Sequence, residues 1–261
     1  MSKFCPLYSS SSGNSVFVSS GDNAILLDVG ASAKGIFEQM QNLNLDTDSV
    51  KAVFLTHAHI DHCKSVKTVC EKLSVPLIAT QKTIDVLETQ NKISGKMQVI
   101  PLESMTDVAN FKIDYFYTRH DCDGSCGYVI TLPDLRKIAV CTDLGIMEDH
   151  IRQKLNGCDL IYIESNYDIN MLKAGPYPPE TKARILSDDG HLSNIACAAE
   201  LPEFLKQGTV QFVLGHLSQN NNLPTIAESC SERTLNLTGA MRNRDYFLNI
   251  AGVIGEKVFY L

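Results

Sequence analysis

The sequence has no Cys-x-x-Cys pair, no long apolar run and no excess of basic residues, and each absence excludes a class of protein. Apolar stretches such as Ala24–Leu27 and Ala52–Leu55 are far shorter than the roughly 18 residues that a membrane helix needs. The nine cysteines are odd in number and scattered, so we expect reduced thiols and no disulfide framework or cysteine-type zinc knuckle. Since the first fifteen residues lack the apolar segment of a secretion signal, the sequence predicts a cytoplasmic protein that contacts no membrane.

Basic residues are in the minority: Lys and Arg number 23 against 30 Asp and Glu, for a formal net charge of −7 at pH 7. This balance excludes a broadly basic nucleic-acid-binding surface, but not a local cleft made positive by bound cations. With 44% hydrophobic and 20% charged residues, the 261-residue chain is apolar enough to fold around a core. No linker, repeat or low-complexity tract interrupts it, so we expect a single domain spanning residues 1–261.

Strand-like and helix-like segments alternate along most of the chain, as is typical of an α/β enzyme. The expected strands are Phe4–Tyr8, Ser15–Ser19, Ala24–Val29, Ala52–Leu55, Pro76–Ala79, Met97–Ile100, Phe111–Tyr117, Gly127–Thr131, Lys137–Thr142, Leu160–Glu164, Val210–Leu214 and Lys257–Leu261. The expected helices are a segment beginning after Ser32, then Cys63–Leu73, Gln81–Gln90, Ile146–Leu155, Pro179–Leu186, Asn194–Leu205 and a segment from Pro224 onward. Between the first two strands we expect a loop over Ser9–Asn14, and we expect Pro202 to break the Asn194–Leu205 helix.

Three of the seven histidines fall within six residues, in the run His57-Ala58-His59-Ile60-Asp61-His62 that directly follows a strand. Neutral imidazoles and carboxylates are ligands for borderline divalent cations. In a tight loop, alternate side chains can turn toward one ion while the next pair reaches a second, so this segment is a candidate two-metal site. The alternative interpretation is a surface cluster of histidines without a metal.

The run His57-x-His59-x-Asp61-His62 resembles the signature of the metallo-β-lactamase superfamily. Other segments extend the resemblance from Ser9 to about Asn222: Asp28 at the end of a strand, His120, Asp143 in Cys141-Thr142-Asp143, and His216 in Gly215-His216-Leu217. The resemblance implies an α+β fold, an αββα sandwich of two packed, mostly antiparallel and mixed sheets with helices outside. It implies two divalent metal ions, Zn, Mn or Fe, at one edge between the sheets.

The resemblance also implies which residues hold the ions. By that resemblance His57, His59 and His120 bind one ion, Asp61, His62 and His216 bind the other, and Asp143 bridges them. Asp28 is expected to hydrogen-bond a ligand histidine and so hold its tautomer.

Within the superfamily the chain is most similar to the WalJ/YycJ-type bacterial hydrolases. The segments that carry this similarity are residues 10–15, His120-Asp121, residues 164–166, Met171-Leu172, residues 175–178, residues 190–194, His216-Leu217-Ser218 and Asn221-Asn222. Two positions depart from the family pattern: Ser65 replaces a usual Gly, and Tyr167 replaces a usual His. We expect the small Ser65 to be tolerated, and we assign no function to Tyr167.

The resemblance implies a metal-bridging hydroxide as nucleophile, with Asp61 among the catalytic residues as well as the ligands. A leaving alkoxide needs a proton, and His191 is the candidate donor, with Glu164 as the carboxylate that orients its ring. The alternative for His191 is a loop residue that caps a helix. Ser12, Asn14 and Asn166 are expected to contact substrate, although the serine-rich loop is also compatible with a simple turn.

The WalJ/YycJ resemblance implies a metal-dependent phosphodiesterase acting on nucleic acid, with DNA favoured and 5′-to-3′ exonuclease activity expected. A second hypothesis is hydrolysis of a small substrate such as a cyclic phosphodiester, thioester or lactone, which the net negative charge favours. A third is a metal-loaded module without hydrolytic activity. The His191 and Glu164 pair favours the first, because poor alkoxide leaving groups require protonation. The sequence predicts no oligomeric state.

Overall fold

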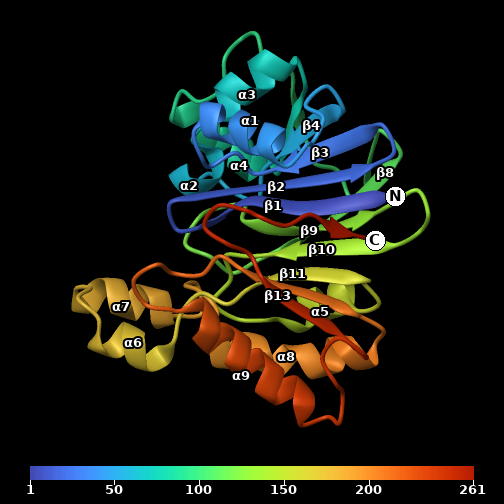
Figure 1. Cartoon of the computed structure of the whole chain (residues 1–261). Helices are drawn as coiled ribbons and strands as arrows, with labels where there is room; N and C mark the ends of the chain where they lie inside the picture. Colours follow the sequence, from blue (N-terminus) through green and yellow to red (C-terminus); the bar gives the residue numbers. More distant parts are fainter.

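The strand-forming segments assemble into two seven-stranded sheets in this computed structural model, which describes residues 1–261 (Figure 1). The first sheet has the order β14 (Phe259–Tyr260), β1 (Ser2–Ser10), β2 (Gly13–Ser20), β3 (Asn23–Leu27), β4 (Val50–Phe54), β5 (Leu77–Ala79) and β6 (Val99–Pro101). The second has the order β13 (Phe247–Ile250), β12 (Gln211–Gly215), β11 (Leu160–Glu164), β10 (Lys137–Cys141), β9 (Cys126–Thr131), β8 (Phe111–Tyr117) and β7 (Thr106–Val108).

Helices cover the outer face of each sheet (Figure 1). The first sheet carries α1 (Ala33–Asn42), α2 (Ile60–Cys63), α3 (Val66–Leu73) and α4 (Gln81–Thr89), and the second carries α5 (Asp149–Leu155), α8 (Asn194–Lys206) and α9 (Pro224–Asn236). Two short helices, α6 (Ile169–Ala174) and α7 (Pro179–Leu186), project at one end of the molecule. None of the helices is long and apolar enough to cross a membrane.

Three large clusters of buried apolar side chains hold these layers together, and each corresponds to one interface. Phe54 and Ile78 of the first sheet pack with Tyr128 and Val140 of the second, in the core between the sheets. The other two clusters lie between each sheet and its own helices. Successive residues of a strand point to opposite faces, so each sheet contributes side chains both to the core between the sheets and to the core under its helices. This arrangement confirms the αββα sandwich expected from the sequence.

Each sheet is mixed, as expected, although antiparallel pairs do not outnumber parallel pairs in either sheet. The strands β3, β4, β5 and β6 pair in parallel, as do β10, β11, β12 and β13. Most of these parallel neighbours are joined by connections that contain helices, because a parallel pair requires a crossover. Parallel strands end at a common edge, and the loops after β3, β4, β10, β11 and β12 therefore meet there.

Several expected boundaries differ from the structure. The helix α8 continues through Pro202 to Lys206, because the buried Leu201 and Phe204 on either side pack into the core and offset the lost hydrogen bond. The expected Ser9–Asn14 loop is a tight turn at Ser11 and Ser12 between β1 and β2. The sequence analysis missed α6, β7 and β13, which are all short. Short elements have weak periodicity and depend on their neighbours.

Candidate metal centre

Three residues of the site adopt the left-handed backbone conformation directly after parallel strands. Asp28 follows β3 with φ 60°, Asp143 lies two residues beyond β10 with φ 59°, and His216 follows β12 with φ 53°. Such angles are uncommon for residues other than glycine and cost of order 1–3 kcal/mol each. All three side chains are buried. The surrounding fold therefore maintains a strained backbone at three points of one edge, a pattern that is typical of functional sites.

A first group of donor atoms comes from His57, His59 and His120. Nε2 of His57 lies 3.0 Å from Nδ1 of His59, and Nε2 of His120 lies 3.3 Å from the same Nδ1 atom. His57 and His59 lie in the loop after β4, whereas His120 lies in the connection between β8 and β9. Three imidazole nitrogens from two loops thus face one point, an arrangement that suits a divalent transition metal.

A second group comes from Asp61, His62 and His216. The Oδ2 atom of Asp61 lies 3.5 Å from Nε2 of His62 and 3.7 Å from Nε2 of His216. Asp143 lies between the two groups, because its carboxylate is 3.3 Å from Nε2 of His62, 3.4 Å from Nε2 of His216 and 3.8 Å from Nε2 of His120. The arrangement predicted from the sequence, two groups with a shared aspartate, is geometrically possible here.

Two polar atoms at this centre are buried without a hydrogen-bond partner, Oδ2 of Asp143 and Nε2 of His216. A buried polar atom that makes no hydrogen bond costs roughly 1–3 kcal/mol, so such atoms are rare in folded proteins. A cation coordinated by a carboxylate oxygen and an imidazole nitrogen removes this cost. The residues present therefore fit divalent metal ions, by the chemistry of the donors as well as by their convergence.

Hydrogen bonds behind the histidines hold their rings in place. Nδ1 of His62 lies 2.8 Å from Oδ2 of Asp28, and Nδ1 of His120 lies 3.0 Å from the carbonyl oxygen of Gly190. Both rings must donate from Nδ1 to these oxygens, which leaves the lone pair of Nε2 for a metal ion at the centre. Asp28 also accepts from the backbone N–H and the hydroxyl of Thr56. The sequence analysis missed Thr56 and Gly190, since a hydroxyl and a carbonyl carry no metal-ligand signature.

Glu164 contacts two histidines through one oxygen. Its Oε1 atom lies 2.7 Å from Nδ1 of His191 and 2.9 Å from Nδ1 of His216. Its Oε2 atom accepts the backbone N–H groups of Leu192 and Leu144. Glu164 is completely buried, and the side chain of His191 is 12% exposed. The expected pair of His191 and Glu164 therefore meets in space, and the contact of Glu164 with His216 was not foreseen.

The residues expected to contact substrate lie in different environments. Asn14 is buried, and its Nδ2 atom lies 3.0 Å from Nε2 of His62. Asn166 is also buried, and its Nδ2 atom contacts His216 at Nδ1 (3.1 Å) and at the carbonyl oxygen (2.8 Å). Ser12 is exposed at the tip of the β1–β2 turn. The two amides adjoin ligand histidines, while only Ser12 faces open solvent.

Charges within the centre shift the pKa values of its histidines in opposite directions. Burial lowers the pKa of His62, but the carboxylates of Asp143 and Asp28 outweigh burial and raise that pKa to about 9. Burial also lowers the pKa of His216, but Asp143 and Asp61 outweigh burial and raise that pKa well above its ordinary value. Burial and the neighbouring His62 keep the pKa of His57 well below its usual value. Neutral imidazole, the form that binds metal, is therefore easiest to reach at His57.

The two departures from the family pattern have local explanations. The hydroxyl of Ser65 donates to the carbonyl oxygen of Ala31, so the side chain adds a hydrogen bond, as expected of a tolerated substitution. Tyr167 is buried in a small apolar cluster with Leu172 and Ile185 that anchors α6 and α7. Position 167 therefore stabilises the projecting helices in this chain.

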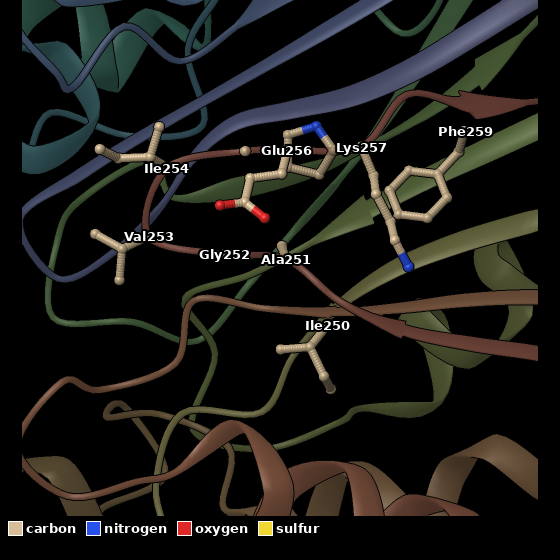
Figure 2. Close-up of a pocket in the computed structure, with 10 residues that line it drawn as sticks. Ile250, Ala251, Gly252, Val253, Ile254, Glu256, Lys257 and Phe259 are labelled. Atoms are coloured by element: carbon tan, nitrogen blue, oxygen red, sulfur yellow. The ribbon is translucent and has the colours of Figure 1, made fainter.

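A separate surface groove of about 350 Å³ lies where the C-terminal segment crosses from β13 to β14. Residues 250–257, Phe259 and Pro6 line it, and Figure 2 shows these side chains along the crossing segment. The groove contains none of the clustered histidines. It is therefore distinct from the candidate metal centre.

Comparisons with known proteins agree with this geometry. The family model of the beta-lactamase superfamily domain matches residues 23–216. Exodeoxyribonuclease YycJ of Bacillus anthracis is 29% identical over 90% of both chains, and exodeoxyribonuclease WalJ of Streptococcus pneumoniae serotype 2 is 30% identical over 86% of this chain and 85% of its own. The crystal structure of the metallo-beta-lactamase fold protein YhfI of Bacillus subtilis superposes with a TM-score of 0.75 at 15% identity, over 99% of this chain and 98% of that one. The chain therefore belongs to the beta-lactamase superfamily and is a WalJ/YycJ-type member of it, as its histidine motif and companion segments predict.

Proposed function

We propose that this chain, a metal-dependent hydrolase, is a 5′-to-3′ DNA exonuclease whose residues 1–261 form one catalytic domain. The observation that carries the proposal is the contact of 2.7 Å between His191 and Glu164 beside the two donor groups. A histidine oriented by a carboxylate beside a metal centre suits a reaction with a poor leaving group, such as the alkoxide released from a phosphodiester. The names of the YycJ and WalJ relatives support a DNA substrate.

We assign the metal ligands as in the sequence analysis. His57, His59 and His120 would hold one divalent ion and Asp61, His62 and His216 the second, with Asp143 close to both groups. Bound divalent ions supply an activated water and neutralise charge on phosphate oxygens. The chain's own residues then supply orientation, since Asp28 holds His62 through Nδ1 and Asn166 donates its side-chain amide to the carbonyl oxygen of His216.

His191 moves the proton that the leaving group needs. Its Nδ1 donates to Glu164, which keeps the ring oriented, so the proton passes to the departing oxygen from Nε2. Glu164 holds this role because it is buried and its other oxygen is fixed by two backbone N–H groups. With Asn166 also donating to Oε1, the carboxylate has five hydrogen-bond donors around it and little freedom to move.

Hydrolysis of a small substrate is a second candidate function. The observation that favours it is the excess of acidic over basic residues, which gives the chain a formal net charge of −7. Acidic groups repel a polyanion and are indifferent to a neutral lactone or thioester.

One experiment distinguishes the two candidates. Metal-loaded protein is incubated with single DNA strands labelled at the 5′ or the 3′ end, and in parallel with a cyclic phosphodiester, a thioester and a lactone. We expect release of mononucleotides from the 5′ end, and loss of that activity by at least about 10³-fold in Asp143→Ala and His59→Ala. Metal-dependent turnover that persists in both variants contradicts the assignment, and turnover of the small substrates alone favours the second candidate.

A further inference from the structure

Arg184 of α7 lies beside the metal centre, one carboxylate away from its donor atoms. Its Nη1 atom lies 2.5 Å from Oδ2 of Asp121. The other oxygen of that carboxylate, Oδ1, lies 3.3 Å from Nε2 of His120 and 3.6 Å from Nε2 of His59. Asp121 therefore separates a permanent positive charge from two candidate ligand histidines.

The guanidinium of Arg184 keeps one edge free. It makes a single hydrogen bond, through Nη1, its side chain is 48% exposed, and Nε and Nη2 have no protein partner. Arg119, two residues before Asp121, differs because its Nε and Nη1 already donate to Asp189 and Asp188. A planar edge with two N–H donors matches two oxygens of a phosphate group, which binds guanidinium groups bidentately.

The position of Arg184 is set before any substrate binds. The next residue, Ile185, is buried with Tyr167 and Leu172 in the small apolar cluster beneath α6 and α7. The ion pair with Asp121 fixes the other end of the side chain. A cation held in place at both ends loses little further freedom when it binds an anion, and the bound geometry is therefore favoured.

We propose that Arg184 binds, through Nε and Nη2, the phosphate next to the scissile one and so selects polynucleotide strands over isolated phosphodiesters. Because Asp121 stands between the guanidinium and the donor atoms, Arg184 is too far out to share the phosphate held at those atoms, and it faces the next phosphate along the strand. This role also supplies a cation for a polyanion in a chain of net charge −7. The inference rests on the proposed nuclease function.

The test compares Arg184→Ala, Arg184→Lys and the matched control Arg119→Ala on two substrates. One substrate is a single DNA strand, and the other is bis(p-nitrophenyl) phosphate, which has no neighbouring phosphate. We expect Arg184→Ala to lower kcat/KM on DNA by about 10- to 100-fold through a higher KM, the range for a charge-assisted hydrogen bond. Activity on the small diester and metal content are expected to stay unchanged, and Arg184→Lys to recover part of the loss.

The dependence on salt supplies a second measurement. Loss of one phosphate contact is expected to reduce the slope of log(kcat/KM) on DNA against log salt concentration by about 1. Equal losses on both substrates, a fall in metal content, or the same loss in Arg119→Ala would show that Arg184 acts only by holding Asp121, and would overturn the inference. If the wild-type protein degrades no DNA, the proposed function is contradicted as well. If the wild type is active and Arg184→Ala degrades DNA equally well, only this inference is overturned.

Discussion

His62 and Asp28 form a buried pair in which Nδ1 of the ring lies 2.8 Å from Oδ2 of the carboxylate. His62 lies in α2 after β4 and Asp28 follows β3, and the parallel pairing of those two strands brings the residues together. Asp28 adopts the left-handed backbone conformation that aims its side chain at His62. The sheet thus places Asp28 against His62, 34 positions later in the chain, where its carboxylate orients the ring of a candidate metal ligand.

Replacement of Asp28 by Asn is expected to weaken metal binding by about 10- to 100-fold, the usual effect of losing a residue that supports a ligand. Asn tolerates the left-handed backbone, so the change removes the charge and leaves the fold intact. The measurement is a competition titration of Zn²⁺ against a fluorescent chelator. Asp107→Asn, on the exposed part of β7, is the control. Equal affinities in the two variants would contradict the prediction.

Replacement of His191 by Ala is expected to lower kcat on DNA by about 10²- to 10⁴-fold, the range for loss of a general acid. Turnover of bis(p-nitrophenyl) phosphate is expected to change little, because p-nitrophenolate leaves without a proton. His150→Ala is the control, since His150 is exposed and bonds only to the carbonyl oxygen of Tyr117. A comparable loss on both substrates would show that His191 supports the metal centre instead of donating a proton.

The metal-free protein is expected to lose stability as the pH rises from 6.5 to 8.5. The folded state keeps His62 protonated up to its pKa of about 9, whereas the unfolded chain releases that proton near 6.5. The unfolded state then binds fewer protons, so the free energy of unfolding falls with pH in this window. His57, whose pKa is lowered, changes stability only below 6.5.

The measurement is the thermal midpoint of chelator-treated protein at several pH values. The window ends at pH 8.5 because buried thiols also lower the free energy of unfolding at higher pH. Cys5 is an example, since burial raises its pKa to about 12. Metal-loaded protein is the control, since its histidines are neutral and metal binding strengthens with pH. A midpoint that stays constant or rises between pH 6.5 and 8.5 would be inconsistent with the charge arrangement.

Replacement of Gly30 by Ala is expected to displace the loop that carries Asp61 and His62. An added Cβ atom at position 30 would overlap the carbonyl oxygen of Asp61, which is backbone and has no room to move. Overpacking of this kind costs typically about 1–3 kcal/mol, and the thermal midpoint falls by about 2–4 °C per kcal/mol in a chain of this size. Gly95→Ala, whose Cβ meets no atom within 4 Å, is the control. Equal midpoints and equal metal affinities in the two variants would refute the prediction.

Much of the fold was predictable because its long elements carry clear periodic patterns. The strand Leu160–Glu164 and the helix from Asn194 are examples. The alternation of such strands and helices along the chain indicates layers of sheet and helix. The short β7, α6 and β13 were missed because a few residues do not repeat a pattern. Pro202 shows the reverse case, in which a strong local signal for a break is outweighed by the burial of Leu201 and Phe204.

The sequence by itself determined which residue types are present at the centre. The spacing His57-x-His59-x-Asp61-His62 lies within six residues, so the candidate metal ligands in it can be recognised from the sequence. Only the tertiary structure decided how those side chains meet. The shared oxygen of Glu164 between His191 and His216, and the ion pair of Asp121 with Arg184, depend on parallel pairing and helix packing between residues far apart in sequence. Such contacts are decided by three-dimensional packing, because no spacing along the chain encodes them.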